Sequence, residues 1–528
     1  MMIEKVPSST FVVPAGMEIA TLAGRLGDGY VIGELGPEEV REEYLDTFEW
    51  RLFMSGRALA RSGRRYRLYS ADGTLLGEGR GPRKKRPFWW NFPEGSLRDE
   101  LVEGADIRAL CPKLHLTKHR RFFQLLNEDE KTVLRLRLER TITLAVASGP
   151  VDTCYLHLDG VRGYEHEFQA VLQLMREDGL EEFPAGTHFL ARILARAGIT
   201  VESQGSKTAI TLPRDVSVRG GLRQVGLAVL SDIRRNLPGT VDDIDTEFLH
   251  DLRISLRRTR SLLSIFTKII PGEQGRHFRA EFRWITQTTG KVRDSDVYLL
   301  QENDYREMLP AALHPGLAGF VRGMREFRNR EFRAMRKCLK SSRFARLLEQ
   351  WQLFLENLPE EPTEEAVLCR EFAARAVKKR FRKLIAQGEN LGPDSPATAL
   401  HALRIEAKKL RYLMEFFHSL FPPDEVELLI RHMKKLQNNL GDFNDLSVQQ
   451  AMLGTFRSPG RIGEPQLNLP IAAALGGLVT RLFERQRQVR GEFETIFADF
   501  ACAENRELVQ TIVRAAGDGP PRDGAGRR

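Results

Sequence analysis

Cysteine and long apolar runs are scarce in this chain of 528 residues. The five cysteines are scattered and include no CxxC pair, which argues against a disulfide framework and is typical of reduced thiols in the cytoplasm. No uninterrupted apolar run reaches the about 20 residues that a membrane-spanning helix needs. The first ten residues, MMIEKVPSST, lack the apolar core of a signal peptide. We therefore expect a cytoplasmic protein with no membrane partner.

Acidic residues are too few to balance the basic ones. The chain has 80 Lys and Arg against 71 Asp and Glu, a formal charge of +9. Most of the excess lies between Asp215 and Gln450, where 39 basic residues face 32 acidic ones. Such a balance favours an anionic partner, and nucleic acid, a membrane surface and phosphate polymers all remain open on this ground.

The length requires more than one core, and the texture of the sequence changes near residue 212. We expect an α+β protein with an antiparallel, β-barrel-like domain over residues 1–212 and an all-α bundle over 217–500. The tail, 515–528, is rich in Gly, Pro and Arg and is predicted to be disordered.

Three stretches carry the prediction of strands. RRYRLYSADGTLLGEG (64–79) has the pattern of a hairpin with Asp72 and Gly73 at the turn. KTVLRLRLERTITLAV (131–146) alternates apolar and charged residues, and residues 153–175 predict one or two more strands. GPRKKRPFWWNFPEGS (81–96) is Pro-broken and very basic, and we interpret it as a solvated loop rather than a separate binding site.

A basic motif occurs twice in the helical part. HDLRISLRRTR (250–260) returns as HALRIEAKKLR (401–411), 151 residues later. GKVRDSDV (290–297) returns as GDFNDLSV (441–448) at the same offset. A register shared by two motifs predicts two tandem helical halves, about 217–385 and 386–500.

On a helix, the cations of each motif form a ladder along one quarter of the circumference. The first ladder is His250, Arg253, Arg257 and Arg260, and the second is His401, Arg404, Lys408 and Arg411. Leucines occupy the adjoining quarter of each helix and are expected to pack into the core. Like charges three or four residues apart repel by a few tenths of a kcal/mol per pair. Acidic partners are sparse, so a bound polyanion with closely spaced phosphates is the favoured interpretation.

Further cations lie in or between the repeated motifs. Arg258 and Lys409 belong to the motifs themselves. The remaining candidates are His277, Arg283, Arg293, Arg431, Lys434 and Lys435. For Asp294, Asp296 and Asp445 we favour a role at helix ends or in ion pairs over metal ligation, because no compact set of ligands accompanies them. No catalytic residue, metal ligand or cofactor is predicted.

The paired motifs strongly resemble the CHAD family over about residues 217–500. The resemblance implies a helical domain of two pseudo-symmetric halves whose basic residues surround a central pore or groove that binds inorganic polyphosphate. By position, it assigns binding to both ladders and, with the intervening helices, to Arg293. It also implies association with cytoplasmic polyphosphate granules.

Most of residues 8–212 resemble the CYTH family, the triphosphate tunnel fold. EEYLDTFEWRLFMSGRALAR (42–61), GYEHEF and SKTAI sit where landmarks of that family lie. The resemblance implies a metal-binding Glu-x-Glu-x-Lys on the first strand, yet the corresponding SSTFVVP (8–14) has no carboxylate and no lysine. Glu165 and Glu167, expected to alternate onto one face of a strand, are the remaining carboxylates. We therefore expect little or no hydrolysis of triphosphate.

The leading interpretation is a polyphosphate-binding protein rather than an enzyme. One alternative is a metal-dependent hydrolase of triphosphate or short polyphosphate that uses the N-terminal domain. The other is a nucleic-acid-binding protein, but the ladders offer no aromatic side chains for stacking, since Tyr412 and Phe266 at their ends resemble core residues. The sequence specifies neither a chain-length preference nor an oligomeric state.

Overall fold

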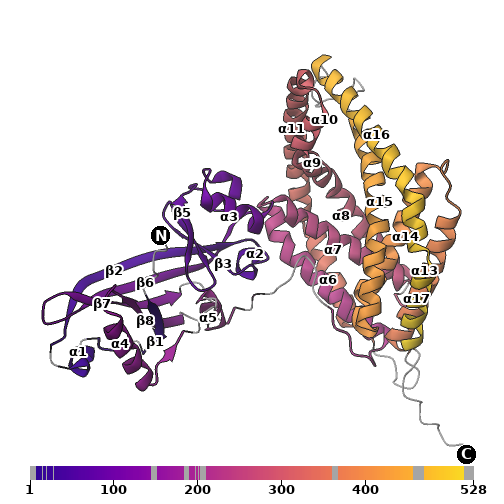
Figure 1. Cartoon of the computed structure of the whole chain (residues 1–528). Helices are drawn as coiled ribbons and strands as arrows, with labels where there is room; N and C mark the ends of the chain where they lie inside the picture. The colour runs from indigo at the N-terminus through magenta and orange to yellow at the C-terminus, as the bar shows by residue number, and fades with distance from the viewer. Residues whose placement is uncertain are drawn as a thin grey trace, which may run out of the picture. The chain divides into compact units, whose positions relative to one another are not determined.

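The chain divides into two compact units, Met1–Gly205 and Ser206–Arg528 (Figure 1). The computed structural model describes residues 7–14, 16–19, 21–27, 29–143, 151–183, 189–196, 198–199, 201, 210–270, 272–359, 367–455 and 469–516. Nearly all of the predicted disordered tail lies outside these residues. No described helix is long and apolar enough to cross a membrane.

The N-terminal unit is built on one antiparallel sheet of nine described strands. Their order is β5-β4-β3-β2-β6-β7-β8-β1-β9. The strands are β1 Ser8–Val12, β2 Val31–Asp46, β3 Arg57–Ser62, β4 Arg65–Ser70, β5 Leu75–Arg80, β6 Cys111–Leu126, β7 Thr132–Thr143, β8 Val151–Gly160 and β9 Glu181–Glu182. No pairing of β5 with β9 occurs among the described residues, so the sheet is open and the predicted barrel-like closure is not observed.

The sequence patterns identify some of these elements correctly. β4 and β5 form the predicted hairpin, with Gly73 at a positive φ of 85° in its turn. The alternating stretch forms β7. The prediction for 153–175 is wrong in its second half, where Glu165–Glu177 is the helix α4. Its buried residues, Phe168, Val171, Leu172 and Met175, recur every three or four positions, which is the period of a helix.

Short helices cover the sheet at several places and complete its cores. They are α1 Thr21–Leu26, α2 Arg51–Met54, the 3-10 helix η1 Trp89–Asn91, α3 Ser96–Ala105, α4 Glu165–Glu177 and α5 Phe189–Arg196. α4 packs on β7 and β8, where Phe168 and Met175 join a cluster with Leu136 and Leu156. α3 lies against β5 and buries Leu97 and Leu101 in a second cluster. The sheet therefore has several small cores rather than a single one.

The second unit is helical throughout its described length. Its helices are α6 Val218–Val241, α7 Thr246–Ile265, α8 Gly272–Thr288, α9 Gly290–Leu300, α10 Glu302–Met308, α11 His314–Leu339, α12 Ser342–Glu356, α13 Cys369–Glu389, α14 Ala397–Phe416, α15 Pro423–Thr455, α16 Leu469–Phe500 and α17 Ala503–Ala515, with 3-10 turns at Ala311–Leu313 and His418–Leu420. α17 contributes Val509 and Ile512 to the main core, so the helical unit extends past residue 500.

The helix boundaries repeat the 151-residue offset of the sequence motifs. α13 begins 151 residues after α6, α14 after α7, and α15 after α8. α15 continues as one helix where the first half has α8 and α9, which are separated at Thr289. Two reciprocal hydrogen bonds join equivalent positions: the Val218 amide donates to the Val367 carbonyl, and the Cys369 amide donates to Val216. The boundaries fit two tandem halves, while their spatial pseudo-symmetry stays a prediction.

Candidate functional site

The two ladder helices lie in the centre of the helical unit. α7 packs against α6, α8, α9 and α14, and α14 packs against α13 and α15 (Figure 1). Asp245 caps α7, because its carboxylate accepts hydrogen bonds from the amides of Glu247 and Phe248. The leucine stripes are buried as predicted, with Leu252 and Leu256 of α7 and Leu403 and Leu410 of α14 at most 1% exposed. Each ladder therefore lies beside a row of leucines that fixes its helix in the core.

Charges from both ladders converge on Lys408. Burial and the positive charges of Arg404 and Arg257 together lower the pKa of Lys408 to about 8, against the opposing charge of Asp445. Arg404 belongs to the same helix, whereas Arg257 comes from α7. The repulsion across the two helices shows that the ladders face one space.

Arg253 is fixed in the same space by neutral groups. Its Nη1 donates to the Thr286 carbonyl (2.9 Å) and to the Thr289 hydroxyl (2.8 Å). Burial and the positive charge of Arg257 together lower the pKa of Arg253 to about 10, against the opposing charge of Asp294. These hydrogen bonds position the guanidinium but leave its charge uncompensated by either partner.

Several donors at the site have no acceptor among the described residues. Arg257 and Lys408 form neither an ion pair nor a hydrogen bond there. The Nε atoms of Arg253, Arg257 and Arg404 are buried without an acceptor. Buried unsatisfied donors each cost about 1–3 kcal/mol, and an anion bound between the helices would relieve that cost.

Other ladder residues extend or brace the cationic surface. The Arg260 side chain is exposed, yet desolvation by the surrounding protein atoms lowers its pKa. The nearby positive charge of Arg283 on α8 lowers the pKa further. Arg411 is held by Glu415 (2.7 Å) and Gln437 (3.1 Å). His401 bonds Asn444 at 2.5 Å. Arg283 therefore joins the first ladder, whereas Arg411 is partly neutralised.

The two equivalent helix positions 293 and 444 each support a ladder. Arg293 pairs with Glu247 at 3.3 Å near the start of α7, and its charge acts on Arg253. Asn444, which bonds His401, escaped the sequence interpretation although it lies 151 residues after Arg293. The repeat register itself was the signal that could have identified it.

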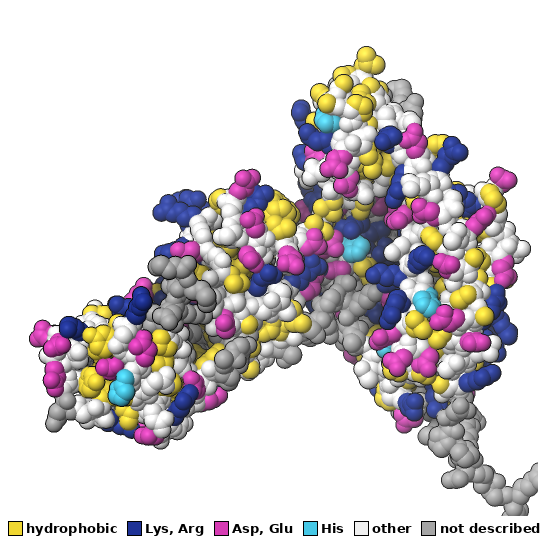
Figure 2. Space-filling view, in the orientation of Figure 1, with side chains coloured by type: hydrophobic (Ala, Val, Ile, Leu, Met, Phe, Trp, Pro, Cys, Tyr) yellow, Lys and Arg dark blue, Asp and Glu magenta, His cyan; other side chains and the backbone are white. Residues whose placement is uncertain are grey.

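The helical unit is hollowed beside these helices. Figure 2 shows Lys and Arg side chains gathered along a depression over α7 and α8, next to α15. Asp294 is exposed, yet burial raises its pKa against the opposing effect of Arg253, and the charge of Asp445 raises it further. The Asp294 side chain is thus exposed to solvent and also surrounded by protein atoms, which fits a position at the bottom of an open hollow.

Two predicted site residues lie off the ladders and form structural ion pairs instead. Arg258 is 2% exposed, pairs with Asp232 of α6 at 3.2 Å and lies over the Phe416 ring. Lys409 pairs at 2.8 Å with Glu406, a buried carboxylate on the side of α14 opposite to the second ladder. Both cations are consumed by structural ion pairs, so we correct their assignment and remove them from the site.

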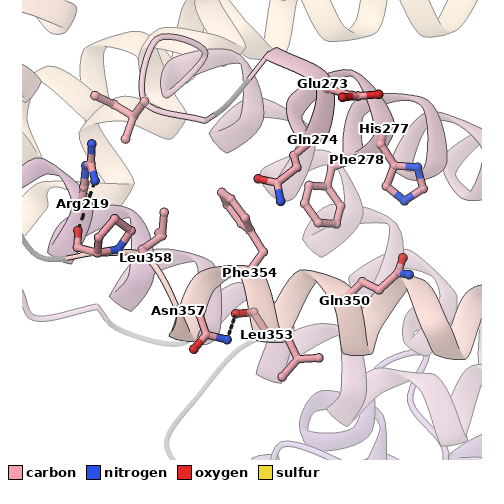
Figure 3. A pocket seen from close by; sticks show the side chains of 12 residues that line it. Arg219, Glu273, Gln274, His277, Phe278, Gln350, Leu353, Phe354, Asn357 and Leu358 are labelled. Atoms are coloured by element: carbon pink, nitrogen blue, oxygen red, sulfur yellow. Dashed lines mark hydrogen bonds between the residues drawn. The ribbon is translucent and has the colours of Figure 1, made fainter.

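His277 lies elsewhere. It lines a pocket of about 790 Å³ between α6, α8 and α12, together with Phe278, Gln350 and Phe354 (Figure 3). No ladder residue lines this pocket. His277 is therefore also removed from the site.

The cations of α15 are exposed, and they differ in their partners. Lys435 pairs with Asp499 at 2.7 Å. Arg431 and Lys434 form no ion pair with the described residues. Lys434 occupies the position equivalent to Arg283, so it is the stronger candidate of the three.

Two of the three acidic residues singled out in the second motif form ion pairs, as favoured from the sequence. Asp445 pairs with Arg404 at 3.2 Å, and Asp296 pairs with Arg328 at 2.8 Å. In the described part of the chain, no three His, Cys, Asp or Glu side chains group closely enough to hold a metal ion.

The N-terminal sheet also contains buried charges, but these neutralise one another. Lys118 of β6 lies 2.8 Å from Glu42 and 3.8 Å from Glu139, and Arg120 bonds Glu139 at 2.7 Å. Burial alone would raise the pKa of Glu139, but Lys118 and its neighbours hold it at about 2. These carboxylates are already committed to cations.

The sheet does not fit the divalent cation that the CYTH resemblance implies. On β1, Ser9 donates to Glu182, and the Thr10 hydroxyl shares a hydrogen bond with His157. No carboxylate stands on this strand. Glu165 and Glu167 lie in the first turn of α4 rather than on a strand, which corrects their expected placement.

The profile of the CHAD domain family matches residues 224–454. This segment is a CHAD domain. It contains both ladder helices and both copies of the second motif. α16 and α17 follow the matched residues of the CHAD domain and still pack into its core.

Relatives of the chain include two uncharacterized proteins from two strains of Mycobacterium tuberculosis. Each is 27% identical over 307 residues, covering 53% of this chain and 56% of the relative. The chain thus spans about half the length of these curated relatives. The crystal structure of the CHAD domain from the plant Ricinus communis matches with a TM-score of 0.48 and 23% identity, covering 56% of this chain and 94% of that one. PptA from Streptomyces chartreusis matches with a TM-score of 0.42 and 19% identity, covering 53% and 99%.

Proposed function

We propose that the CHAD domain binds inorganic polyphosphate between its two ladders, as the family resemblance implies. The observation that carries this proposal is the set of facing cations centred on Arg257 and Lys408, two residues that form no ion pair with the described residues, although the charge of Asp445 acts on Lys408. Their mutual repulsion is a cost to the free protein that a threaded polyanion would convert into attraction. Arginine forks hold phosphate oxygens in pairs, and Lys408 supplies a point charge.

A phosphate polymer suits the site better than a nucleic acid does. Phe266, at the end of the first ladder, is fully buried, and Tyr412 stacks on Phe416. Phe266 therefore offers no ring face for a base, and the stacking covers one face of Tyr412. An extended chain with one charge per phosphate requires only the cations that the ladders present.

The test is a binding titration of the full chain with polyphosphates of several lengths. Arg257→Glu with Lys408→Glu replaces two cations that have no partners among the described residues, so the fold should tolerate the change. We expect affinity to fall at least about 100-fold, because reversing a desolvated charge at an interface costs about 2–5 kcal/mol.

A matched control is Lys378→Glu with Lys379→Glu, which changes the net charge equally. Both lysines are exposed on α13, beside Arg380, which pairs with Glu406 on the side of α14 away from the ladder. The control should bind within a few-fold of the wild type, since exposed charges beyond about 10 Å are screened. Unchanged affinity in the ladder variant would refute the proposal, as would stronger binding of single-stranded RNA to the ladders in competition.

We further infer that the N-terminal unit is a divergent relative of CYTH domains and acts as a companion rather than a hydrolase. The charged row of Glu42, Lys118 and Glu139 supports the relationship. A phosphate-release assay with Mg²⁺ or Mn²⁺ on the same sample tests the enzyme alternative. Association with polyphosphate granules is a corollary, which imaging of the tagged ladder variant beside the wild type would test.

A further inference from the structure

The basic segment after β5 is a second surface that the polyphosphate proposal does not use. Three consecutive exposed cations, Arg83, Lys84 and Lys85, precede the aromatic residues Phe88 and Trp90. We call these five residues the basic–aromatic platform. Figure 2 shows Lys and Arg side chains projecting beside β5 in this unit.

The platform is a loop with exposed cations, as the sequence predicts, but its backbone is anchored at many points. The Tyr66 hydroxyl donates to the Pro82 carbonyl (2.9 Å), and Arg61 donates to the Lys84 carbonyl (2.9 Å). The Leu110 amide donates to the Pro87 carbonyl at 2.8 Å. These contacts fix the backbone while leaving the basic side chains outside.

Glycine is required at the start of this segment. A Cβ on Gly81 would lie 2.5 Å from the Tyr66 ring and 2.8 Å from Phe92. Tyr66 and Phe92 are buried and pack edge to face at 4.8 Å. The chain therefore passes directly over a rigid aromatic core, which pre-organises the platform.

The cations of the platform are not neutralised locally. Arg83 and Lys85 form no ion pair with the described residues, and neither do Arg64 and Arg80, which lie on the adjoining strand ends. Arg83 and Lys85 line a pocket of about 730 Å³, whose two carboxylates, Glu42 and Glu43, are paired with Lys118 and Arg61. Such a surface attracts an anion of several charges.

The stacked rings of Phe88 and Trp90 favour an anion that carries a flat ring over one that does not. The rings of Phe88 and Trp90 stack at 4.4 Å and 12°, while Trp89 meets Trp90 edge-on. Trp90 is 42% exposed, so part of its ring stays open to solvent. Lys84 reaches the same turn, where its Nζ donates to Asn91 at 3.4 Å. A flat, supported ring beside cations suits an unpaired base next to its own phosphate.

We propose that the basic–aromatic platform binds single-stranded nucleic acid, independently of the ladders. A duplex keeps its base faces stacked inside, and polyphosphate has none, so only an unpaired strand uses both parts of the platform. Oligo(rU) and oligo(dT) share this chemistry, and comparing them distinguishes an RNA strand from a DNA strand.

The experiment measures fluorescence anisotropy of labelled oligo(rU) and oligo(dT) with the full chain. Trp90→Ala should weaken binding by about fivefold or more, the effect of losing one stacked base, whereas Trp90→Phe should retain most of it. Quenching of tryptophan emission on binding should disappear in Trp90→Phe. Arg83→Glu with Lys85→Glu should weaken binding further and reduce its salt dependence.

Matched controls separate this surface from others. Lys131→Glu with Arg162→Glu makes the same charge change at exposed positions of the same unit and should leave oligonucleotide binding unchanged. The ladder variant should lose polyphosphate and keep the oligonucleotide, while Trp90→Ala does the reverse. Thermal unfolding of each variant establishes that it is folded.

Three results would overturn the inference. The first is oligonucleotide binding that is unaffected in both platform variants. The second is polyphosphate binding that falls with Trp90→Ala as much as oligonucleotide binding does. The third is Trp90-dependent binding to anionic phosphatidylserine vesicles without oligonucleotide binding, which would assign the platform to a lipid surface.

Discussion

Two lysines, one in each unit, occupy opposite electrostatic situations. Burial would lower the pKa of Lys118, but Tyr44, Glu139 and Glu42 raise it above its usual range. Burial likewise lowers the pKa of Lys408, and there the neighbouring arginines deepen the shift to about 8. The charged row around Lys118 is therefore neutralised within the sheet, while Lys408 of the CHAD domain lies among cations and forms no ion pair with the described residues. A buried charge indicates a binding site only when its own fold fails to balance it.

The largest expected effect separates the two lysines by stability. Lys118→Ala leaves Glu42 and Glu139 buried without their shared cation and should lower the free energy of unfolding by about 5 kcal/mol, the upper end for a broken buried ion pair. Lys408→Ala removes a repelled charge and should change it by less than about 1 kcal/mol. Calorimetry of both variants at neutral pH measures this contrast. Equal destabilisation would contradict the distinction between the units.

A smaller effect is expected at Arg258, a cation of the first motif that lies in a buried ion pair. Arg258→Ala breaks the buried pair with Asp232 and should cost about 3 kcal/mol. Polyphosphate affinity of the folded variant should stay within about twofold, because Arg258 faces away from the ladder. Denaturant unfolding and the binding titration together check this. A loss of affinity without a loss of stability would return Arg258 to the site.

The smallest effect is a pH dependence. Because the pKa of Lys408 is about 8 in the free protein, a bound polyanion should raise it and binding should take up a proton. Affinity should then be highest below pH 8 and fall by up to about tenfold between pH 7 and 9. Lys408→Met, which cannot titrate, should bind more weakly and lose this dependence. An unchanged pH profile in Lys408→Met would assign the titration to another group.

The stability of the free protein depends on pH with the opposite sign to that of the binding affinity. The unfolded chain holds the Lys408 proton up to a pKa of about 10.4, whereas the folded chain releases it near 8. Between these values the unfolded state binds more protons, so this group makes the free protein more stable as pH rises. Polyphosphate affinity should therefore fall while the free energy of unfolding rises over the same pH interval. This combination would identify a lysine whose charged form is destabilised by neighbouring cations.

The sequence predicts the features that leave a periodic pattern or a repeat in it. The leucine stripes of α7 and α14 and the alternation in β7 follow directly from those patterns. Arg257 and Arg258 are adjacent and identical in type, yet a rotation of about 100° directs one to the hollow and the other toward Asp232. That partner lies 26 residues earlier on α6, and no local pattern reports it.

Helix and strand periods are also hard to separate in short amphipathic segments. Glu165 and Glu167 lie two residues apart, which suits a strand face, but the apolar residues after them follow a helical period. The open sheet depends on which strands meet at its edges, and pairing between distant strands leaves no mark in the local sequence. The anchoring of Pro82 and Lys84 was hidden for the same reason, since its donors come from β3 and β4.

The different supports of Arg253 and Arg404 have a consequence for release. Arg253 is held by a carbonyl and a hydroxyl, which keep its charge available, whereas Arg404 is held by the carboxylate of Asp445. In the proposed complex, a phosphate that takes the Nη2 donor of Arg404 would displace Asp445, and the same carboxylate could return when the phosphate leaves. In the proposed complex the second ladder would thus carry its own competitor at Arg404, and this exchange would lower the barrier for a long polymer to leave the protein one phosphate at a time.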